Sequence, residues 1–396
     1  MRTDLVAAVN ALTARWLAAA GPRALVVSGL GVWPLLALIA EPSEGPGRAE
    51  LAAALGVAPE ESMADARAVL ELVNACPAAA MAGGLWTRSG LELEPGWVQR
   101  LPEGTRGRIT GAPLIDAPVL DGWAEKHTAG RIRKFPITTT PDTRLVLATA
   151  LSVETTWEQP FDETVLSIPS GGPWPEGETA ALSRSSHELE HVRVVPTPHG
   201  AFTDVTVVGD RGVDVHLVLG PAEAEPGAVL AAGVAAVAPA AEDAATPGTA
   251  FTADEPHPGP GITVERARAY HPADELRLRT VPFEVTAAHD LLEHAEVFGL
   301  RSVSDLRRGH FPGISRERLG VGAAAQNILA RFSATGFEAA AVTALGVFGT
   351  SVLSRAHEVT RVSVSFDRPF AYYAVDRGSG LILVAGWLGE LTGPAR

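Results

Sequence analysis

The chain has 396 residues, 46% of them hydrophobic and 20% charged, which is enough to bury the large core of a globular protein. Its formal net charge of −14 argues against nucleic acid or a membrane as partner, because both present negative charge to an acidic surface. The single cysteine excludes an internal disulfide, and the N-terminal stretch mixes charges into its apolar residues. Both features favour a cytoplasmic protein.

The first third of the chain has the spacing of amphipathic helices, with apolar residues recurring at intervals of three and four. This spacing covers residues 5–19, 33–40, 48–55 and 63–76. Gly56 follows the third stretch, where a glycine commonly ends a helix. The sequence therefore predicts four consecutive helices before any strand.

From residue 80 onward the pattern changes to short runs of β-branched and aromatic residues bounded by Gly or Pro. These predicted strands cover residues 80–87, 145–153, 192–195, 202–208 and 213–219. Helical spacing returns in residues 117–132, 227–237 and 287–298. Helices followed by strands with scattered helices predict an α+β fold. Residues 238–261, rich in Ala, Pro and acidic residues, are predicted to form a flexible surface loop.

The C-terminal segment predicts a hairpin. Residues 370–375 form one strand, a turn follows at residues 376–380, and residues 381–387 form the second strand. A further alternating run precedes it at residues 362–366. Its aromatic and branched residues are typical of strands in the core of a sheet.

This hairpin, FDRPFAYYAVDRGSGLILVAGWL, resembles the C-terminal signature of the serpin family. Further segments resemble the family in the same order along the sequence. They are residues 48–56, the helix with Trp123, Thr128 and Ile132, residues 145–161 (LVLATALSVETTWEQPF), residues 280–300 with their Pro-x-Phe strand, residues 311–315, and residues 336–343 (GFEAAAVT). By these matches the protein is identified as a member of the serpin family, of the bacterial type.

The resemblance implies one α+β domain over residues 1–396. It would have a large central sheet, further sheets, about eight or nine helices and an exposed reactive-centre loop over residues 336–357. It also implies a mechanism. A serine or cysteine protease attacks the loop and forms an acyl-enzyme, and the cut loop then inserts into the central sheet as a new strand before water can release the protease.

The resemblance places the hinge of that loop at Gly336, Phe337, Glu338, Ala339, Ala340 and Ala341. Small residues suit insertion, because alternate side chains of the new strand must fit inside the sheet. Phe337 departs from the small residue that is usual there, so it should slow insertion or need a waiting cavity. Ala334 replaces the acidic residue that usually anchors the hinge.

The resemblance leaves the scissile bond open between two registers. Counting from Gly336 gives Thr350–Ser351, whereas counting back from Pro369 moves it toward Arg355–Ala356. The resemblance also implies that opening of the central sheet depends on four residues, which are Ser28, Thr149, Trp157 and Gln326. At two of these positions the family usually has Asn and His, where this sequence has Thr149 and Gln326. Trp157 is retained. The sequence therefore keeps the family's scaffold but differs in the gate, the residues at which the central sheet would open.

The sequence also contains His187-Glu188-Leu189-Glu190-His191, which matches the H-E-x-x-H pattern of zinc hydrolases. That pattern needs a helix, and the β-like run that follows argues against one. No metal, no cofactor and no catalytic residue is therefore predicted, and an enzyme is disfavoured.

The leading hypothesis is a serpin-type inhibitor of a serine or cysteine protease. The alternatives are a non-inhibitory protein of the same fold that binds a small molecule or a partner, and the same scaffold recruited as an enzyme in a biosynthetic pathway.

Overall fold

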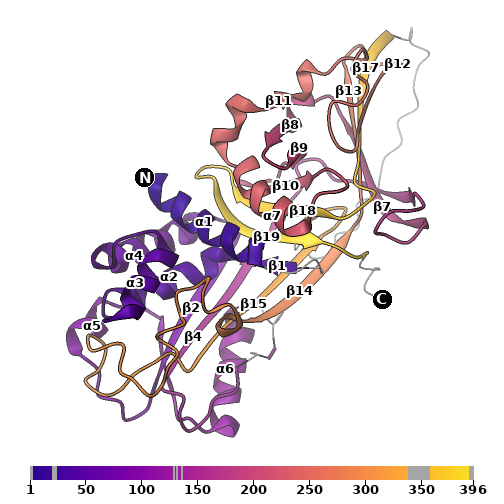
Figure 1. Ribbon diagram of the computed structural model, residues 1–396. Coiled ribbons are helices and arrows are strands. Elements are labelled where there is room, and N and C mark those ends of the chain that lie inside the picture. The colour runs from indigo at the N-terminus through magenta and orange to yellow at the C-terminus, as the bar shows by residue number, and fades with distance from the viewer. Residues whose placement is uncertain are drawn as a thin grey trace.

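The structure is a computed structural model that describes residues 3–19, 25–127, 130, 133–134, 137–337 and 357–391 (Figure 1). Seven α-helices lie in these residues: α1 Thr3–Ala19, α2 Gly29–Ala40, α3 Pro46–Leu55, α4 Pro59–Ala75, α5 Pro95–Arg100, α6 Pro113–His127 and α7 Pro226–Ala236. Four short 3-10 segments accompany them: η1 Leu189–His191, η2 Pro239–Ala244, η3 Gly248–Ala250 and η4 Leu291–His294. None of the described helices is long and apolar enough to cross a bilayer.

The central sheet is the largest platform on which the helices pack. Its strands run in the order β3 (Arg106–Ile109), β2 (Ala79–Arg88), β4 (Leu145–Val153), β15 (Ala323–Phe332), β16 (Gly336–Phe337) and β5 (Thr155–Thr156), and β14 (Phe283–Asp290) also pairs with β15. Helix α2 packs against β2 and β4, with all twelve of its residues buried. This complete burial explains why its sequence is apolar all round and not amphipathic.

Two further sheets complete the fold. One runs in the order β1 (Leu25–Val27), β19 (Leu381–Leu388), β18 (Phe370–Asp376), β10 (Val213–Leu219), β9 (Gly200–Val207), β8 (Val192–Thr197) and β11 (Thr246–Pro247). The other runs in the order β12 (Ile262–Ala269), β17 (His357–Ser365), β13 (Glu275–Thr280), β7 (Gly177–Ser186) and β6 (Asp162–Ile168). In Figure 1 the ends of β12 and β17 lie at the opposite end of the molecule from α5 and α6.

The structure confirms most of the predicted elements. The four N-terminal helices, α7, the five predicted strands and the C-terminal hairpin all form at the expected positions. Phe366, Phe370, Tyr372 and Tyr373 are fully buried, as a core hairpin requires. The helix predicted over residues 117–132 begins earlier and is described to His127, while Thr128 and Ile132 lie outside the described residues.

Two predictions are wrong. Residues 287–298 do not form a helix, because residues 287–290 complete strand β14 and only the 3-10 turn η4 follows. The cause is tertiary: β14 pairs antiparallel with β15 from Phe283↔Phe332 to Asp290↔Ala325, and this ladder outweighs the local helical spacing. Residues 238–261, predicted as a flexible loop, contain η2, β11 and η3. Without a helix at 287–298, the described α-helices number seven and not the eight or nine expected.

Candidate functional site: the hinge and gate of the central sheet

The middle of the central sheet is closed. Strands β4 and β15 pair directly with each other in parallel, from Val146↔Ala323 to Leu151↔Ile328. No other described strand lies between them over this length. The two central strands are therefore hydrogen-bonded directly to each other. A sheet that is to accept a new strand at that place must start in this arrangement.

At one end the same sheet has already parted. The two-residue strand β16 lies between β15 and β5, with Phe337 paired to Phe332 on one side and to Thr155 on the other. Because β5 follows β4 after only Glu154, β16 enters along the line that separates β4 from β15. The Phe337 side chain is 0% exposed, so the aromatic ring expected to resist insertion already occupies a place in the core.

A tight turn links β15 to β16. The Ser333 backbone N–H donates to the Gly336 carbonyl at 2.9 Å, and the Ser333 hydroxyl donates to the same carbonyl at 3.0 Å. The Phe161 N–H donates to the Ala334 carbonyl at 2.8 Å, and the Trp157 N–H to the Thr335 carbonyl at 3.0 Å. Backbone groups thus hold the hinge base where Ala334 offers no acidic side chain.

An aromatic cluster supports this turn. The Trp157 ring lies 4.8 Å from that of Phe332, and the Phe161 ring lies 5.6 Å from it. The Trp157 indole N–H donates to the Ser333 carbonyl at 2.9 Å. The Arg184 guanidinium sits 4.8 Å from the centre of the Phe161 ring, and its burial lowers the pKa of Arg184 to about 10. The cluster fixes the end of β15 beside which Phe337 is seated.

The gate is a buried hydrogen-bond network centred on Gln326. Its amide oxygen accepts from the Ser28 N–H at 2.9 Å, and its amide nitrogen donates to the Ser28 carbonyl at 2.8 Å. The same nitrogen donates to the Thr149 hydroxyl at a longer 3.3 Å. Gln326 is therefore tied firmly to Ser28 and only weakly across to β4.

Gly31 makes this network possible. A Cβ atom at Gly31 would stand 2.6 Å from the Gln326 amide nitrogen and 3.1 Å from the Thr149 hydroxyl. The Ser28 hydroxyl caps α2 by accepting from the Gly31 N–H at 3.1 Å, and it donates to the Leu383 carbonyl at 2.6 Å. The start of α2 thus joins β15 to the C-terminal hairpin.

Asp210 is a site residue that the sequence did not reveal. Its carboxylate accepts from the Thr155 hydroxyl at 3.2 Å, and from the Thr156 N–H at 3.1 Å and hydroxyl at 2.8 Å. Burial opposes ionisation, but these hydrogen bonds, led by Thr156, hold the pKa of Asp210 below its usual value. Asp210 anchors β5, the strand against which β16 pairs. The Asp-Arg-Gly turn that contains it gave only a turn signal.

The structure brings some of the predicted site residues together and separates others. Ser28, Thr149 and Gln326 meet in the gate, whereas Trp157 lies with the hinge, beside Gly336 and Phe337. The remaining hinge and scissile candidates lie outside the described residues; they are Glu338, Ala339, Ala340, Ala341, Thr350, Ser351, Arg355 and Ala356.

This arrangement of helices and strands is similar to that of known proteins. The family model for serpins, described as serine protease inhibitors, matches residues 10–167. The chain has the fold of this family, and its residues 10–167 resemble the family in sequence.

Solved structures show the same fold over nearly the whole chain. Human thyroxine-binding globulin bound to its hormone is 14% identical, with a TM-score of 0.73 over 97% of this chain and 98% of that one. Serpin48 from the insect Tenebrio molitor is 17% identical, with a TM-score of 0.70 over 99% of each chain. Protease nexin-1, solved with heparin, is 14% identical, with a TM-score of 0.70 over 98% of this chain and 99% of that one. No curated protein sequence matches this one.

The zinc-like pattern does not lie on an α-helix in this protein. Leu189–His191 is a single 3-10 turn, and the two histidines point to different partners. His187 contacts the Asp274 carbonyl at 2.9 Å and stacks on His271, whereas His191 lies 3.3 Å from the Glu188 carboxylate. Within the described ranges, no three His, Cys, Asp or Glu side chains converge as metal ligands.

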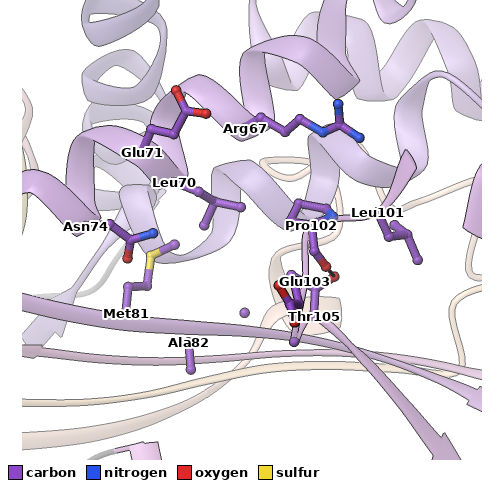
Figure 2. A pocket seen from close by; sticks show the side chains of 12 residues that line it. Arg67, Leu70, Glu71, Asn74, Met81, Ala82, Leu101, Pro102, Glu103 and Thr105 are labelled. Atoms are coloured by element: carbon purple, nitrogen blue, oxygen red, sulfur yellow. Dashed lines mark hydrogen bonds between the residues drawn. The ribbon is translucent and has the colours of Figure 1, made fainter. Parts of the chain in front are cut away.

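A recess of about 580 Å³ lies between α4 and β2, and Figure 2 shows it from close by. In this view Glu71, Asn74 and Arg67 come from the helix, Met81 and Ala82 come from the strand, and Pro102, Glu103 and Thr105 close the other side. Its lining mixes apolar side chains, among them Leu70 and Met81, with the polar side chains of Arg67, Glu71 and Asn74.

Proposed function

We propose that the protein is a suicide-substrate inhibitor of a serine or cysteine protease, acting through a reactive loop at residues 336–357 of a single domain. The observation that supports this is the position of β16, which lies between β15 and β5 at the end of a sheet whose strands β4 and β15 are otherwise paired. A strand that begins in this position has a path along which it can lengthen, and pairing along that path stabilises the cut form.

The register of β16 defines that path. Phe337 pairs antiparallel with Phe332, so a strand lengthened in the same register would set Ala341 opposite Ile328 and Thr343 opposite Gln326. Alternate residues of a strand share a face, so Ala339, Ala341 and Thr343 would join Phe337 on the buried side. The small side chains of the hinge are therefore at the positions where space is most limited.

The gate favours opening at the same place. Lengthening of β16 would break the pairs between β4 and β15 and the single 3.3 Å hydrogen bond from Gln326 to Thr149. The two shorter bonds join Gln326 to Ser28 at the start of α2 and do not reach β4 itself, so they need not break. Each broken backbone pair is replaced by pairs to the new strand on both sides.

Incubation with trypsin, chymotrypsin, elastase and subtilisin tests the proposal. The expected product is a band at the summed mass on denaturing electrophoresis, with mass analysis locating the cut between residues 338 and 356 and choosing between Thr350–Ser351 and Arg355–Ala356. The cut protein should also melt at a higher temperature than the intact one. Cleavage in the loop without a covalent band would contradict inhibition.

Two matched variants separate insertion from cleavage. Ala341→Asp would bring a charge to the buried face of the new strand, and it should abolish the covalent band while leaving the loop cleavable. Ala340→Asp would place the same charge on the opposite face and should have a smaller effect. Equal loss in both variants would contradict the proposed register.

A second candidate function is binding of a small molecule, which the recess between α4 and β2 favours. Thyroxine, the ligand bound by the similar globulin, is a suitable first probe. Binding in the recess should raise the melting temperature of the intact protein, and Met81→Trp, which fills part of the recess, should remove that rise. The same scaffold recruited as an enzyme is a third candidate, and we propose the cytoplasm of a bacterium as the setting for each.

A further inference from the structure

A second recess, of about 480 Å³, lies where the end of β7 meets the segment that follows β5 and the residue that follows β9. Its volume is within the range of about 300–1,000 Å³ that is typical of ligand pockets. No residue of β15 or β16 lines it, so the recess is separate from the path proposed for β16. Among its lining side chains, the one that sets its chemistry is Arg184, near the end of β7.

Arg184 is largely buried, and its guanidinium has few partners. The residue is only 9% exposed. Its Nη1 donates to the Gln159 carbonyl at 3.0 Å, and its guanidinium carbon lies 4.8 Å from the centre of the Phe161 ring. Within the part of the chain that the structure describes, no other hydrogen bond and no ion pair engages this group. A guanidinium has more N–H donors than these contacts use, and a buried arginine charge is normally paired.

The two carboxylates that line the recess have partners of their own. Glu158 lies 3.8 Å from Arg377, and Glu188 lies 3.3 Å from His191. Burial lowers the pKa of Arg184 to about 10, and the charge of Glu188 opposes this lowering without forming an ion pair. Arg184 is therefore charged at neutral pH, and no described carboxylate is in contact with it.

We propose that this recess binds a small organic acid, whose carboxylate pairs with the guanidinium of Arg184. The edge formed by Nε and Nη2 has no hydrogen-bond partner among the described residues. Such an edge can donate two parallel hydrogen bonds to the two oxygens of one carboxylate. A monocarboxylate is favoured over a phosphate, because Glu158 and Glu188 would repel a second negative charge in the recess.

The recess is connected to the hinge through Phe161. The ring that Arg184 contacts lies 5.6 Å from the Phe332 ring, and the Phe161 N–H donates to the Ala334 carbonyl at 2.8 Å. An acid that held Arg184 in place would also hold the Gln159 carbonyl and the Phe161 ring. Binding should therefore stabilise the turn between β15 and β16 and raise the melting temperature of the intact protein.

Isothermal titration calorimetry of the full chain with butyrate and benzoate tests the site. Butyramide and benzamide are neutral compounds of the same shape, and sodium chloride at equal ionic strength controls for screening. The wild type should bind the two acids, should bind neither amide, and should bind inorganic phosphate more weakly than either acid.

Arg184→Gln should weaken the binding of both acids roughly tenfold or more, because it removes the charge and the paired donors. Arg279→Gln is the matched control. Arg279 is exposed on the neighbouring strand β13 and pairs with Ser183, so it lies on the other face of the sheet from Arg184. This control should bind the acids as the wild type does.

Glu188→Gln keeps the test decisive if Arg184→Gln folds poorly. It removes a negative charge from the recess and should tighten the binding of both acids several-fold, whereas a purely structural Arg184 predicts no binding to tighten. Absence of binding by the wild type, binding that survives Arg184→Gln, or an equal response to chloride would overturn the site. Tighter binding of phosphate would overturn the choice of a monocarboxylate. The covalent band expected with proteases is independent of all these results, so the proposed function is tested separately.

Discussion

The two ends of the stretch from residue 338 to residue 356 are held very differently. On the hinge side the stretch emerges from β16, a strand of two residues with one pair to β15 and two to β5. On the other side it enters β17, a strand of nine residues flanked by β12 and β13 along a buried face. The hinge side is therefore held by few backbone pairs, whereas the other side is held along a whole strand on both edges.

Because of this difference, the two segments of a cut loop would behave differently. If the loop is cut as proposed, only the segment attached to Phe337 continues a strand that already lies at the end of the line between β4 and β15. The segment attached to His357 is already paired on both edges and gains nothing by moving. The asymmetry of anchoring, more than any single hinge residue, determines which part of the loop would move.

Replacing Phe337, on the hinge side, should lower the free energy of unfolding more than replacing Gln326 or Asp210. Phe337→Ala leaves a cavity where the fully buried ring now sits, and it should lower the free energy of unfolding by about 3 kcal/mol. Phe337→Leu keeps most of the volume and should cost about 1 kcal/mol. Urea denaturation followed by tryptophan fluorescence measures both. A negligible effect of Phe337→Ala would mean that β16 is not held by this side chain.

Replacing Gln326 should have an intermediate effect. Gln326→Ala leaves the buried N–H of Ser28 without its partner and removes a second hydrogen bond, to the Ser28 carbonyl, which should together cost about 2 kcal/mol in the free energy of unfolding. Thr149→Val, which removes only the long bond across to β4, should cost less than about 1 kcal/mol. Thermal denaturation gives the ranking. If Thr149→Val proved the more damaging change, the gate would be held across β4 and not at Ser28.

Replacing Asp210 should have the smallest effect and should depend on pH. Hydrogen bonds from Thr156 and Thr155 hold the pKa of Asp210 below its unfolded value, so the carboxylate stabilises the fold above that value and this contribution fades as the pH falls through the lowered pKa. At neutral pH, Asp210→Asn should cost about 1 kcal/mol, and the difference from wild type should shrink below pH of about 3.9.

Urea unfolding of wild type, Asp210→Asn and the exposed-site control Asp142→Asn at neutral and acid pH measures this dependence. The control should match wild type throughout, because the Asp142 side chain is exposed. A pH-independent cost of Asp210→Asn would show that the charge of Asp210 does not anchor β5.

The protein's helices and most of its strands could be predicted from local pattern. Residues 5–19 and 63–76 carry helical spacing, and residues 145–153 and 213–219 are short stretches rich in Val and Leu, so local pattern favours one conformation for each. Resemblance to serpins then predicted a large central sheet with further sheets, and it pointed to Ser28, Thr149 and Gln326 as residues of the sheet gate. Pattern failed at residues 287–290, because the partner that makes them a strand is β15, more than thirty residues further along the sequence.

The sequence by itself predicted the α+β class and the resemblance to serpins, since these depend on residue type and local order. Only the tertiary structure decided that Phe337 is seated beside Thr155, that Asp210 anchors β5, and that β12 covers the edge of β17. Each of these contacts joins segments far apart in the sequence. The hydrogen bond between Gln326 and Ser28 likewise spans almost three hundred residues. No local pattern encodes such a contact, because it exists only when the whole polypeptide has closed around it.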